Sequence, residues 1–320
     1  MTIDKTDEKI LAYLDNDART PNTKIAKALR LNKNLVNYRI KNMEDSGLIK
    51  GYYTMIDSYL LGYQGYRFYL KFQYTDQKKE AEMMDYLVNQ KNTWFVAYLR
   101  GRWDMAAILW VNEQQELVDS INSFISKYRE FIEGHILVVY YGIRHYRFPF
   151  TKKYLKTKSN FDYFKIGEQV KIDNVDFKLL KFISANARAS LVQIAKGLGI
   201  TPGAVTYRMK QLKYKKIIRG FRPVFDTKKL GYSLYKIDIN VRDGATTEQL
   251  YKFAREHDEI FYLDQTLGYA DVEIEAQVNN EQQFLDLLDE IRTRFSGQIR
   301  NYSFFIVDET TKFKYIPDYQ

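Results

Sequence analysis

The segment VQIAKGLGITPGAVTYRMKQL, residues 192–212, decides the fold of this chain, and a related segment, TKIAKALRLNKNLVNYRIKNM, occupies residues 23–43. The two segments align at a constant offset of 169, and the likeness extends without a gap over residues 3–63 and 172–232. A repeat of this length corresponds to a whole domain rather than to one supersecondary unit. The sequence therefore indicates a tandem duplication.

Each copy predicts three short helices. In the second copy the expected helices are residues 176–185, 192–198 and about 202–213, and in the first copy they are 7–14, 23–29 and 33–44. Thr201 is expected to cap the third helix of the second copy, with Pro202 at its first position, and Asn32 takes the capping place in the first copy. This order is typical of a helix-turn-helix.

The third helix of each copy is amphipathic. Apolar residues at helical spacing, Val36, Ile40 and Met43 in one copy and Val205, Met209 and Leu212 in the other, are expected to face a core. The opposite polar face suits a DNA major groove. The residues predicted to contact DNA are Asn32, Lys33, Asn34, Asn37, Tyr38, Arg39, Lys41, Thr201, Gly203, Thr206, Tyr207, Arg208, Lys210, Lys215 and Lys216.

Two of these assignments carry an alternative. Arg208 lies at the margin of the buried face, so either a phosphate contact or an internal ion pair is expected of it. Arg30 stands where the second copy has Gly199, at a turn that commonly needs a left-handed backbone, which costs a non-glycine residue about 1 kcal/mol. The first helix-turn-helix could therefore be altered or weaker.

Basic charge is concentrated in the second copy. The chain has a net charge of +9, but residues 172–231 contain 13 Lys and Arg against 3 Asp and Glu, while residues 232–320 contain 9 against 17. Several of the cations belong to what we expect to be a basic β-wing after the third helix: Lys213, Lys215, Lys216, Arg219 and Arg222. Cations beside a groove-reading helix neutralise phosphates and position that helix. A role in packing or dimerisation alone remains open for both copies, and especially for the first copy, which is nearly neutral.

Beyond each helix-turn-helix the periodicity changes to a βαββαβ order. The expected elements are residues 66–74, 80–90, 93–99, 105–111, 113–130 and 135–144, and then 234–241, 247–256, 260–266, 272–278, 281–295 and 299–307. This order implies a four-stranded antiparallel sheet with two helices on one face. The fold class is therefore α+β, with two repeats of a winged helix-turn-helix followed by a ferredoxin-like domain.

The combination resembles the Lrp/AsnC family of leucine-responsive regulators. The resemblance rests on the helix-turn-helix, the Leu61-Gly62-Tyr63 exit, repeated as Leu230-Gly231-Tyr232, and a Gly-x-x-Asp hairpin in each sheet. It implies RAM-type sheet domains that dimerise and bind small effectors such as amino acids near the hairpins. The effector residues implied are Gly101, Arg102, Trp103, Asp104, Gly268, Tyr269 and Asp271.

These implied effector residues have alternatives, and the chain departs from the family in being fused. The glycines and aspartates of the hairpins can equally serve turn chemistry alone. For Arg102, both a surface salt bridge and a pair with a ligand carboxylate are open. Because Ala270 occupies the place of Trp103, we expect the two sites to differ.

The duplication and the change of periodicity divide the chain into five segments. They are helix-turn-helix domains at 1–61 and 172–231, βαββαβ domains at 62–149 and 232–320, and a basic, solvated linker at 150–171 that includes Lys152, Lys153, Lys156 and Lys158. The two sheets are expected to form a pseudo-dimer within one chain, which could assemble further.

Composition narrows the function classes. There are no cysteines and three histidines, His135, His145 and His257, so we expect no metal site, cofactor or catalytic residue. No apolar run has the roughly 18 residues of a membrane span, and the chain has no signal-peptide pattern at its start. We expect a cytoplasmic, prokaryotic protein that is not an enzyme.

Three functions remain to be compared. The leading hypothesis is a sequence-specific transcription regulator with two unequal readers of double-stranded DNA. A second is a sirohaem decarboxylase-like tetrapyrrole enzyme, because some relatives of this architecture have that activity; its candidate residues would be His135 or His145 with Arg144 and Arg147. A third is an architectural protein that binds DNA broadly through charge.

Overall fold

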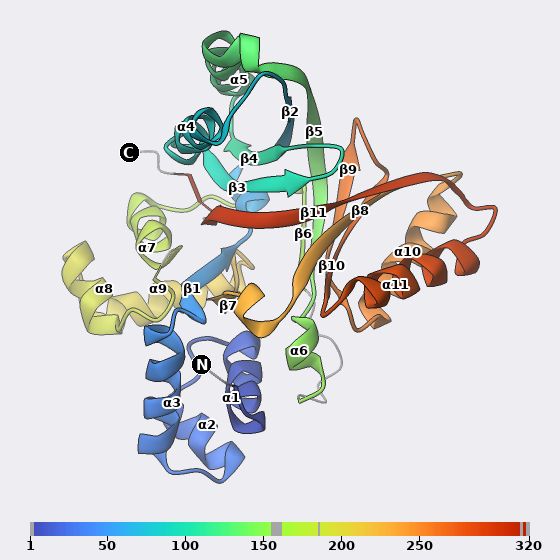
Figure 1. The fold of residues 1–320 in the computed structure, drawn as a ribbon. Helices are drawn as coiled ribbons and strands as arrows, with labels where there is room; N and C mark the ends of the chain where they lie inside the picture. Colours follow the sequence, from blue (N-terminus) through green and yellow to red (C-terminus); the bar gives the residue numbers. More distant parts are fainter. Residues whose placement is uncertain (1–2, 155–161, 185, 314–315, 318–320) are drawn as a thin grey trace. The chain divides into compact units, whose positions relative to one another are not determined.

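The computed structural model describes residues 3–154, 162–184, 186–313 and 316–317 (Figure 1). It divides into two compact units. Unit 1 contains residues 1–57, 146–161 and 170–232, and unit 2 contains residues 58–145, 162–169 and 233–320. Each unit thus combines the corresponding domains of both repeats, although those domains are far apart in sequence.

Unit 1 contains two three-helix bundles. The first consists of α1 (Lys5–Asn16), α2 (Asn22–Leu29) and α3 (Lys33–Asp45), and the second of α7 (Asn174–Ser184), α8 (Leu191–Leu198) and α9 (Pro202–Tyr214). Local capping explains where several of them begin. Asp4 and Ser190 each form a capping box, which satisfies backbone N–H groups of α1 and α8. The predicted helices are confirmed, except that Ala185 lies outside the described residues.

The wing of each copy is a single strand, and the two strands pair with each other. β1 (Ile49–Ile56) runs antiparallel to β7 (Ile218–Phe225). Backbone bonds repeat with the offset of the duplication: Ala18 N donates to Phe221 O, and Ala187 N donates to Tyr52 O. The two bundles are therefore joined in one unit by a pseudo-symmetric ribbon.

The ribbon corrects one expectation about the basic wing. Arg222 is buried, donates to the carbonyl oxygen of Tyr146 at 2.7 Å and lies 3.7 Å from the Asp15 carboxylate. Strand pairing turns this side chain into the interior, where it cannot reach a phosphate.

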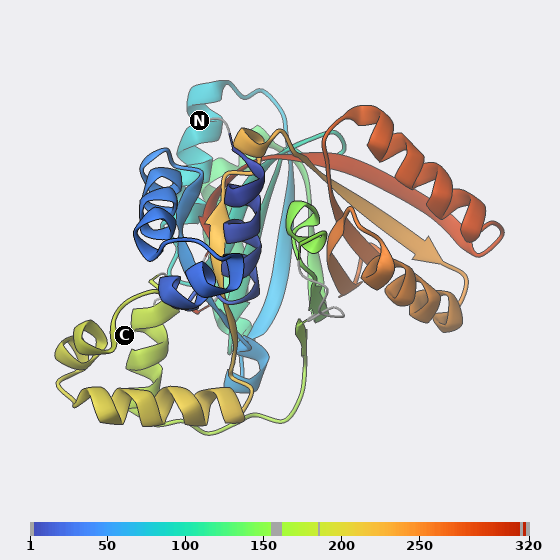
Figure 2. The same cartoon turned by 90° about the horizontal axis from the view of Figure 1, so that it is seen from below.

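Unit 2 contains both βαββαβ domains. The first half-sheet comprises β2 (Gln64–Phe72), β3 (Thr93–Arg100), β4 (Met105–Val111) and β5 (Ile132–His145), covered by α4 (Gln77–Val88) and α5 (Gln114–Tyr128). The second half-sheet comprises β8 (Ser233–Val241), β9 (Ile260–Leu267), β10 (Val272–Val278) and β11 (Ile299–Phe313), covered by α10 (Gly244–Glu256) and α11 (Glu281–Arg294) (Figure 2). Both predicted element orders are confirmed.

The two half-sheets close into one ring. β11 pairs with β3, β5 pairs with β9, and β2 pairs with both β4 and β5, so the pairing returns to its starting strand. One face of the first half-sheet packs on α4 and α5 through Phe68, Leu70 and Phe124. Its other face, with Tyr69 and Val138, packs inside the ring against Phe305 and Val307 of the second half-sheet. The expected pseudo-dimer is thus a closed sheet with an interior shared by both repeats.

The connecting segment 150–171 is partly built into these units. α6 (Pro149–Lys152) packs in unit 1 with Phe150 and Thr151 buried, and the Thr151 hydroxyl donates to Asp15 at 2.6 Å. β6 (Asp162–Lys165) pairs with β5 in unit 2. The connector is therefore not a solvated linker over these elements, because Phe150 and Phe164 are buried. Lys156 and Lys158 lie outside the described residues.

Candidate nucleic-acid interface

α9 presents the polar face that its sequence predicts. The Thr201 hydroxyl accepts the N–H of Ala204 at 3.1 Å, and Pro202 fills the first helical position. Val205, Met209 and Leu212 are buried, whereas Gly203, Tyr207 and Lys210 are exposed. The exposed Thr206 donates its hydroxyl to the carbonyl oxygen of Pro202 at 3.0 Å, so its remaining capacity is as an acceptor.

α3 repeats this arrangement with different chemistry. Val36, Ile40 and Met43 are buried, and Asn32 caps the helix by accepting the N–H of Asn34 at 2.7 Å. The exposed residues are Lys33, Asn34, Asn37, Tyr38 and Lys41. Asn37 accepts a hydrogen bond from the side chain of Asn22 at 2.8 Å, which orients its amide. Tyr38 and Tyr207 occupy equivalent places and are both 64% exposed.

The turn before each third helix has the predicted left-handed backbone. Gly199 has φ 67° and ψ 31°, and Arg30, the equivalent residue, has φ 56° and ψ 42°. Arg30 therefore bears the conformational cost that Gly199 avoids. The geometry of the first helix-turn-helix is retained despite this cost.

Arg39 and Arg208 form internal ion pairs. Arg208 lies 2.7 Å from both Asp173 and Asp176, and Arg39 lies 2.8 Å from Asp4 and 2.9 Å from Asp7. Hydrogen bonds to these carboxylates raise the pKa of each guanidinium. Of the two roles expected for Arg208, the internal pair is the one present, and it ties the recognition helix to the first helix of its bundle.

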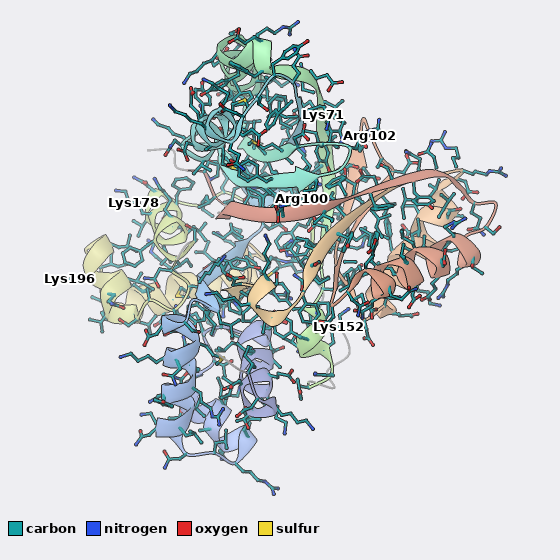
Figure 3. The ribbon with its side chains drawn as sticks, in the orientation of Figure 1. Lys71, Arg100, Arg102, Lys152, Lys178 and Lys196 are labelled. Atoms are coloured by element: carbon teal, nitrogen blue, oxygen red, sulfur yellow. The ribbon has the colours of Figure 1, made fainter. Side chains whose placement is uncertain are left out.

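Further cations are exposed on the second copy. Lys215 and Lys216 follow α9, and Lys215 donates to the carbonyl oxygen of Lys171 at 3.3 Å. Lys178 on α7 and Lys196 on α8 are also exposed (Figure 3). We did not single out these two from the sequence, although both are repeated in the first copy as Lys9 and Lys27.

The two hairpins of unit 2 use their aspartates in the same structural way. Asp104 accepts the N–H of Phe72 at 2.7 Å, and Asp271 accepts the N–H of Val241 at 2.8 Å. Phe72 and Val241 are equivalent residues at the ends of β2 and β8. Gly101, with φ 135°, and Gly268, with φ 105°, supply the turns. Each aspartate therefore braces its hairpin to the neighbouring strand.

The aromatic residues of the hairpins meet inside the ring. Trp103 is buried, stacks on Tyr69 at 5.6 Å and points its indole nitrogen at the Tyr269 hydroxyl, 3.4 Å away. The exposed Arg102 places its guanidinium 5.1 Å from the centre of the Tyr269 ring. Among the described residues no carboxylate pairs with Arg102, so the salt bridge considered from the sequence is absent there.

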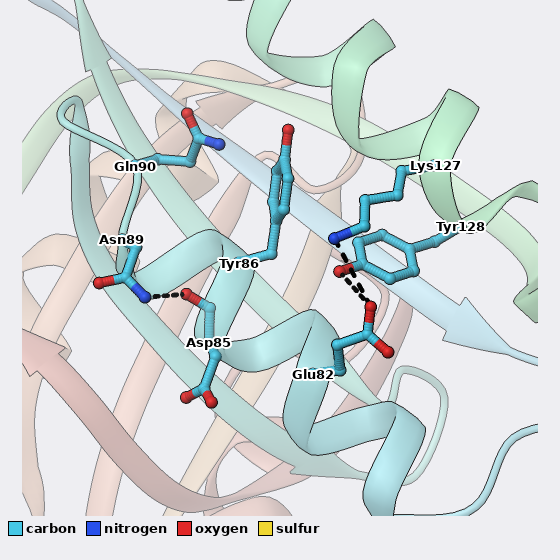
Figure 4. Close-up of a pocket in the computed structure, with 7 residues that line it drawn as sticks. All are labelled: Glu82, Asp85, Tyr86, Asn89, Gln90, Lys127 and Tyr128. Carbon is cyan, nitrogen blue, oxygen red and sulfur yellow. Dashed lines mark hydrogen bonds and ion pairs between the residues drawn. The ribbon is translucent and has the colours of Figure 1, made fainter.

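A separate pocket lies on the outer helices of the first half-sheet. It has a volume of about 390 Å³ and is lined by Glu82, Asp85, Tyr86, Asn89, Gln90, Lys127 and Tyr128. Figure 4 shows Lys127 and the Tyr128 hydroxyl directed at Glu82, at 3.5 Å and 3.1 Å. None of the predicted effector residues lines it. Within the described part of the chain no group of three or more His, Asp or Glu side chains could hold a metal ion.

Comparison with known proteins shows the family. A model described as winged helix-turn-helix DNA-binding matches residues 3–50 and 172–219. The HTH-type transcriptional regulator Ptr1 of Methanocaldococcus jannaschii is 38% identical over 101 residues, 31% of this chain and 68% of that protein. The regulator LrpA of Pyrococcus horikoshii is 33% identical over 128 residues, 39% of this chain and 87% of LrpA. The chain belongs to the Lrp/AsnC family.

This Lrp/AsnC chain also shares a two-repeat fold with a solved enzyme. The sirohaem decarboxylase NirDL, solved with an iron-uroporphyrin III analogue, superposes with a TM-score of 0.65 at 12% identity, covering 98% of this chain and 94% of NirDL. At that identity the likeness shows the fold alone. Among the described helices, none is long and apolar enough to cross a bilayer.

The residues considered for a tetrapyrrole enzyme are divided between the two units of this Lrp/AsnC chain. His145 is buried against Tyr262, with ring centres 4.0 Å apart, while His135 is exposed on β5. Arg144 lies between the rings of Tyr163 and Tyr251 and donates to Gln265 at 2.6 Å. Arg147 belongs to unit 1, where it donates to Asn16.

Proposed function

We propose that this chain is a sequence-specific transcription regulator in which α3 and α9 read two unequal half-sites of one operator. Membership of the Lrp/AsnC family and two helix-turn-helix matches support DNA binding as the common activity. The observation that carries the finer proposal is the difference between equivalent exposed positions. Asn34 and Asn37 on α3 correspond to Gly203 and Thr206 on α9.

These side chains favour different bases. An asparagine amide can donate and accept at once and so pairs well with adenine, whereas a threonine offers one hydroxyl and a methyl group, and glycine offers only backbone. A symmetric dimer repeats one reader and so demands a near-palindrome. Two unequal readers in one unit remove that demand.

The second reader is proposed to supply most of the electrostatic affinity. Its segment carries the large basic excess, and exposed Lys210, Lys215 and Lys216 lie on or just beyond α9. Each phosphate contact adds a salt-dependent contribution to binding. The nearly neutral first reader then contributes mainly discrimination between sequences.

The test is a genome-fragment binding selection with purified chain at physiological salt, repeated with Lys41→Ala and Lys210→Ala. Enriched asymmetric sites that both variants bind more weakly would support the proposal. Enrichment of perfect palindromes alone would contradict it. A steep salt dependence with no enrichment would support the architectural alternative instead.

We further propose that Arg102 binds the carboxylate of a small effector such as an amino acid. Support comes from its exposed guanidinium, held over Tyr269 without an acidic partner among the described residues. A guanidinium can offer two parallel donors to a carboxylate. In a thermal-shift screen of amino acids, a stabilising ligand should lose its effect with Arg102→Ala and keep it with Arg100→Ala. Equal loss in both variants would contradict this role.

Tetrapyrrole binding is the second candidate, because the fold is shared with NirDL over nearly the whole of both chains. The burial of His145 and the contacts that already occupy Arg144 count against it. Titration of the purified chain with an iron tetrapyrrole, followed by absorbance, decides the matter. A saturable spectral change that is lost with a substitution at His145 would support the enzyme.

A further inference from the structure

Six charged side chains cluster inside the ring of unit 2. Arg67 and Lys236 are the cations, and the carboxylates are Asp238, Asp264, Glu273 and Glu275. All but Glu275 are almost completely buried. Buried charges are costly unless they are paired, so this cluster must influence how the two half-sheets fit together.

Arg67 is the cation that the first half-sheet contributes. Its guanidinium lies 2.6 Å from Glu273, 3.3 Å from Asp264 and 3.6 Å from Glu275, all on the second half-sheet. Lys236, by contrast, pairs with the same three carboxylates from within its own half-sheet. Within this buried cluster, the ionic contacts between the half-sheets therefore converge on one arginine. Among the described residues, the other ion pair between the halves, Arg100 with Asp308, lies at the exposed edge of the pairing.

Strand register shows which residues are equivalent in the two half-sheets. Arg67 lies opposite Ile108 in β2–β4, and Lys236 lies opposite Glu275 in β8–β10. Two residues further along β2 and β8, Tyr69 lies opposite Ala106, and Asp238 lies opposite Glu273. Ala97 lies opposite Ala106 just as Asp264 lies opposite Glu273.

The two half-sheets thus have the same backbone arrangement, but their interior side chains differ in charge. The first offers Arg67 with Tyr69, Ala97, Ala106 and Ile108, whereas the second offers Lys236 with four carboxylates at or beside the equivalent places. Two copies of the first would bury two arginines without a carboxylate from these positions. Two copies of the second would bring together eight carboxylates, six of them at buried positions, with only two lysines.

Acids already outnumber cations in the observed pairing. Burial raises the pKa of Asp238 and of Asp264. Burial opposes ionisation of Glu273 as well, but Lys236 and Arg67 lower its pKa overall. The charges of Lys236 and Arg67 and a hydrogen bond from Tyr269 only partly offset this effect of burial on Asp238. The interior therefore has no capacity for a second acidic half-sheet.

The sizes of the interior side chains also favour the pairing of unlike half-sheets. Trp103 fills the interior from the first half-sheet, and its equivalent in the second is Ala270. Trp103 packs against Tyr269 and Tyr69 in the observed pairing. Two copies of the first half-sheet would bring two tryptophans into this space.

We propose that this interior is a pairing lock, which makes each half-sheet bind the opposite half-sheet and reject a copy of itself. Unfavourable like pairings are as effective as favourable unlike ones in setting partner choice. The consequence is that every closed ring contains one half-sheet of each kind. The lock thus excludes rings built from two first half-sheets, or from two second half-sheets, of different chains.

Cysteine reporters can test the lock, because the chain has no cysteine of its own. Val139 lies opposite Leu267 in the observed ring, so Val139→Cys with Leu267→Cys reports pairing of unlike halves. Arg100 is equivalent to Leu267, and Ile306, which lies opposite Arg100, is equivalent to Val139. Arg100→Cys with Val139→Cys therefore reports pairing of two first half-sheets from different chains.

Both reporter pairs are refolded under oxidising conditions over a range of chain concentrations. With the natural interior, the first pair should close within one chain and the second should give no covalent dimer. A control interior replaces all six charges, by Arg67→Met, Lys236→Met, Asp238→Asn, Asp264→Ala, Glu273→Ala and Glu275→Ile. Neutralising a buried ion cluster with apolar residues often preserves folding.

With the neutral interior, the yield of covalent dimer from the second pair should rise with chain concentration. This yield should be about tenfold greater than with the natural interior. Dimer with the natural interior would overturn the lock. So would a neutral chain that closes the first pair and forms no dimer, since covalent linkage of the halves would then suffice to set pairing.

A second comparison covers the case in which the neutral chain does not fold. Glu273→Ala should lower the denaturant midpoint, and adding Ala106→Glu moves the carboxylate to the equivalent place in the first half-sheet, where Lys236 becomes its cation across the ring. Partial recovery of the midpoint supports complementarity between the halves. A double variant no more stable than Glu273→Ala contradicts it.

Discussion

Single residues record how far the two repeats have diverged. Arg30 adopts the left-handed backbone that Gly199 adopts in the other copy. Arg30→Gly should therefore raise the free energy of unfolding of unit 1 by about 1 kcal/mol, and Gly199→Ala should lower it by a similar amount. Urea denaturation followed by circular dichroism measures both. A loss of stability in Arg30→Gly would show that the arginine side chain contributes more than its backbone costs.

His257 predicts a pH dependence at the same scale. Burial lowers the pKa of His257, but hydrogen bonds to Glu259 at 2.8 Å and Glu290 at 3.1 Å raise it overall. The hydrogen bond with His257 in turn lowers the pKa of Glu259 to about 2. A histidine with a raised pKa stabilises the fold below its unfolded value, about 6.5, and this contribution is lost as pH rises through the folded value.

His257→Gln should accordingly cost about 1 kcal/mol near pH 5 and much less near pH 9. Thermal denaturation of the wild type and the variant at both pH values gives the comparison. His135→Gln, at an exposed position, is the control and should show no such convergence. A gap that stays constant with pH would mean that His257 acts through packing.

At the scale of elements, ion pairs hold each recognition helix on its bundle. Arg208 joins α9 to Asp173 and Asp176, and the exposed part of this pair limits its value to about 1 kcal/mol. Arg208→Met should lower stability by that amount, and Asp173→Asn should have a similar effect because it removes part of the same pair. The salt dependence of DNA binding should not change.

This last measurement separates the two roles of Arg208. A residue that contacts a phosphate reduces the slope of log K against log salt by about 1 when it is removed. Lys210→Met provides the matched case, because Lys210 is exposed on the same helix without such a pair among the described residues. If Arg208→Met reduces the slope as Lys210→Met does, the arginine also reaches DNA.

At the scale of the whole molecule, the β1–β7 ribbon joins the two helix-turn-helix bundles in one compact unit. We expect the spacing of the two half-sites to be fixed, because strand pairing leaves the bundles little freedom to separate. Inserting 5 base pairs, about half a turn, between half-sites should weaken binding at least about tenfold, and 10 base pairs should not restore it. Electrophoretic mobility shifts with purified chain measure this. Restored binding at 10 base pairs would indicate a flexible connection.

The sequence by itself was sufficient for the repeat, the helix-turn-helix and the βαββαβ order. Caps such as Thr201-Pro202 and Asn32, and the spacing of Val205, Met209 and Leu212, are local signals that depend on residues within a few turns. The exposed faces of α3 and α9 follow from the same spacing, which is why most predicted interface residues are at the surface. The same local reasoning correctly placed a left-handed residue at Arg30.

Only the tertiary structure decided which segments pair. The partners of β7, Arg208 and Arg67 lie far away in sequence or across the ring, and no local pattern indicates them. Arg222 shows the physical reason: on sequence alone a cation after a recognition helix suits a phosphate, but strand pairing buries it beside Asp15. Side-chain periodicity determines elements, whereas the choice among distant partners depends on charge and shape that become neighbours only in the folded chain.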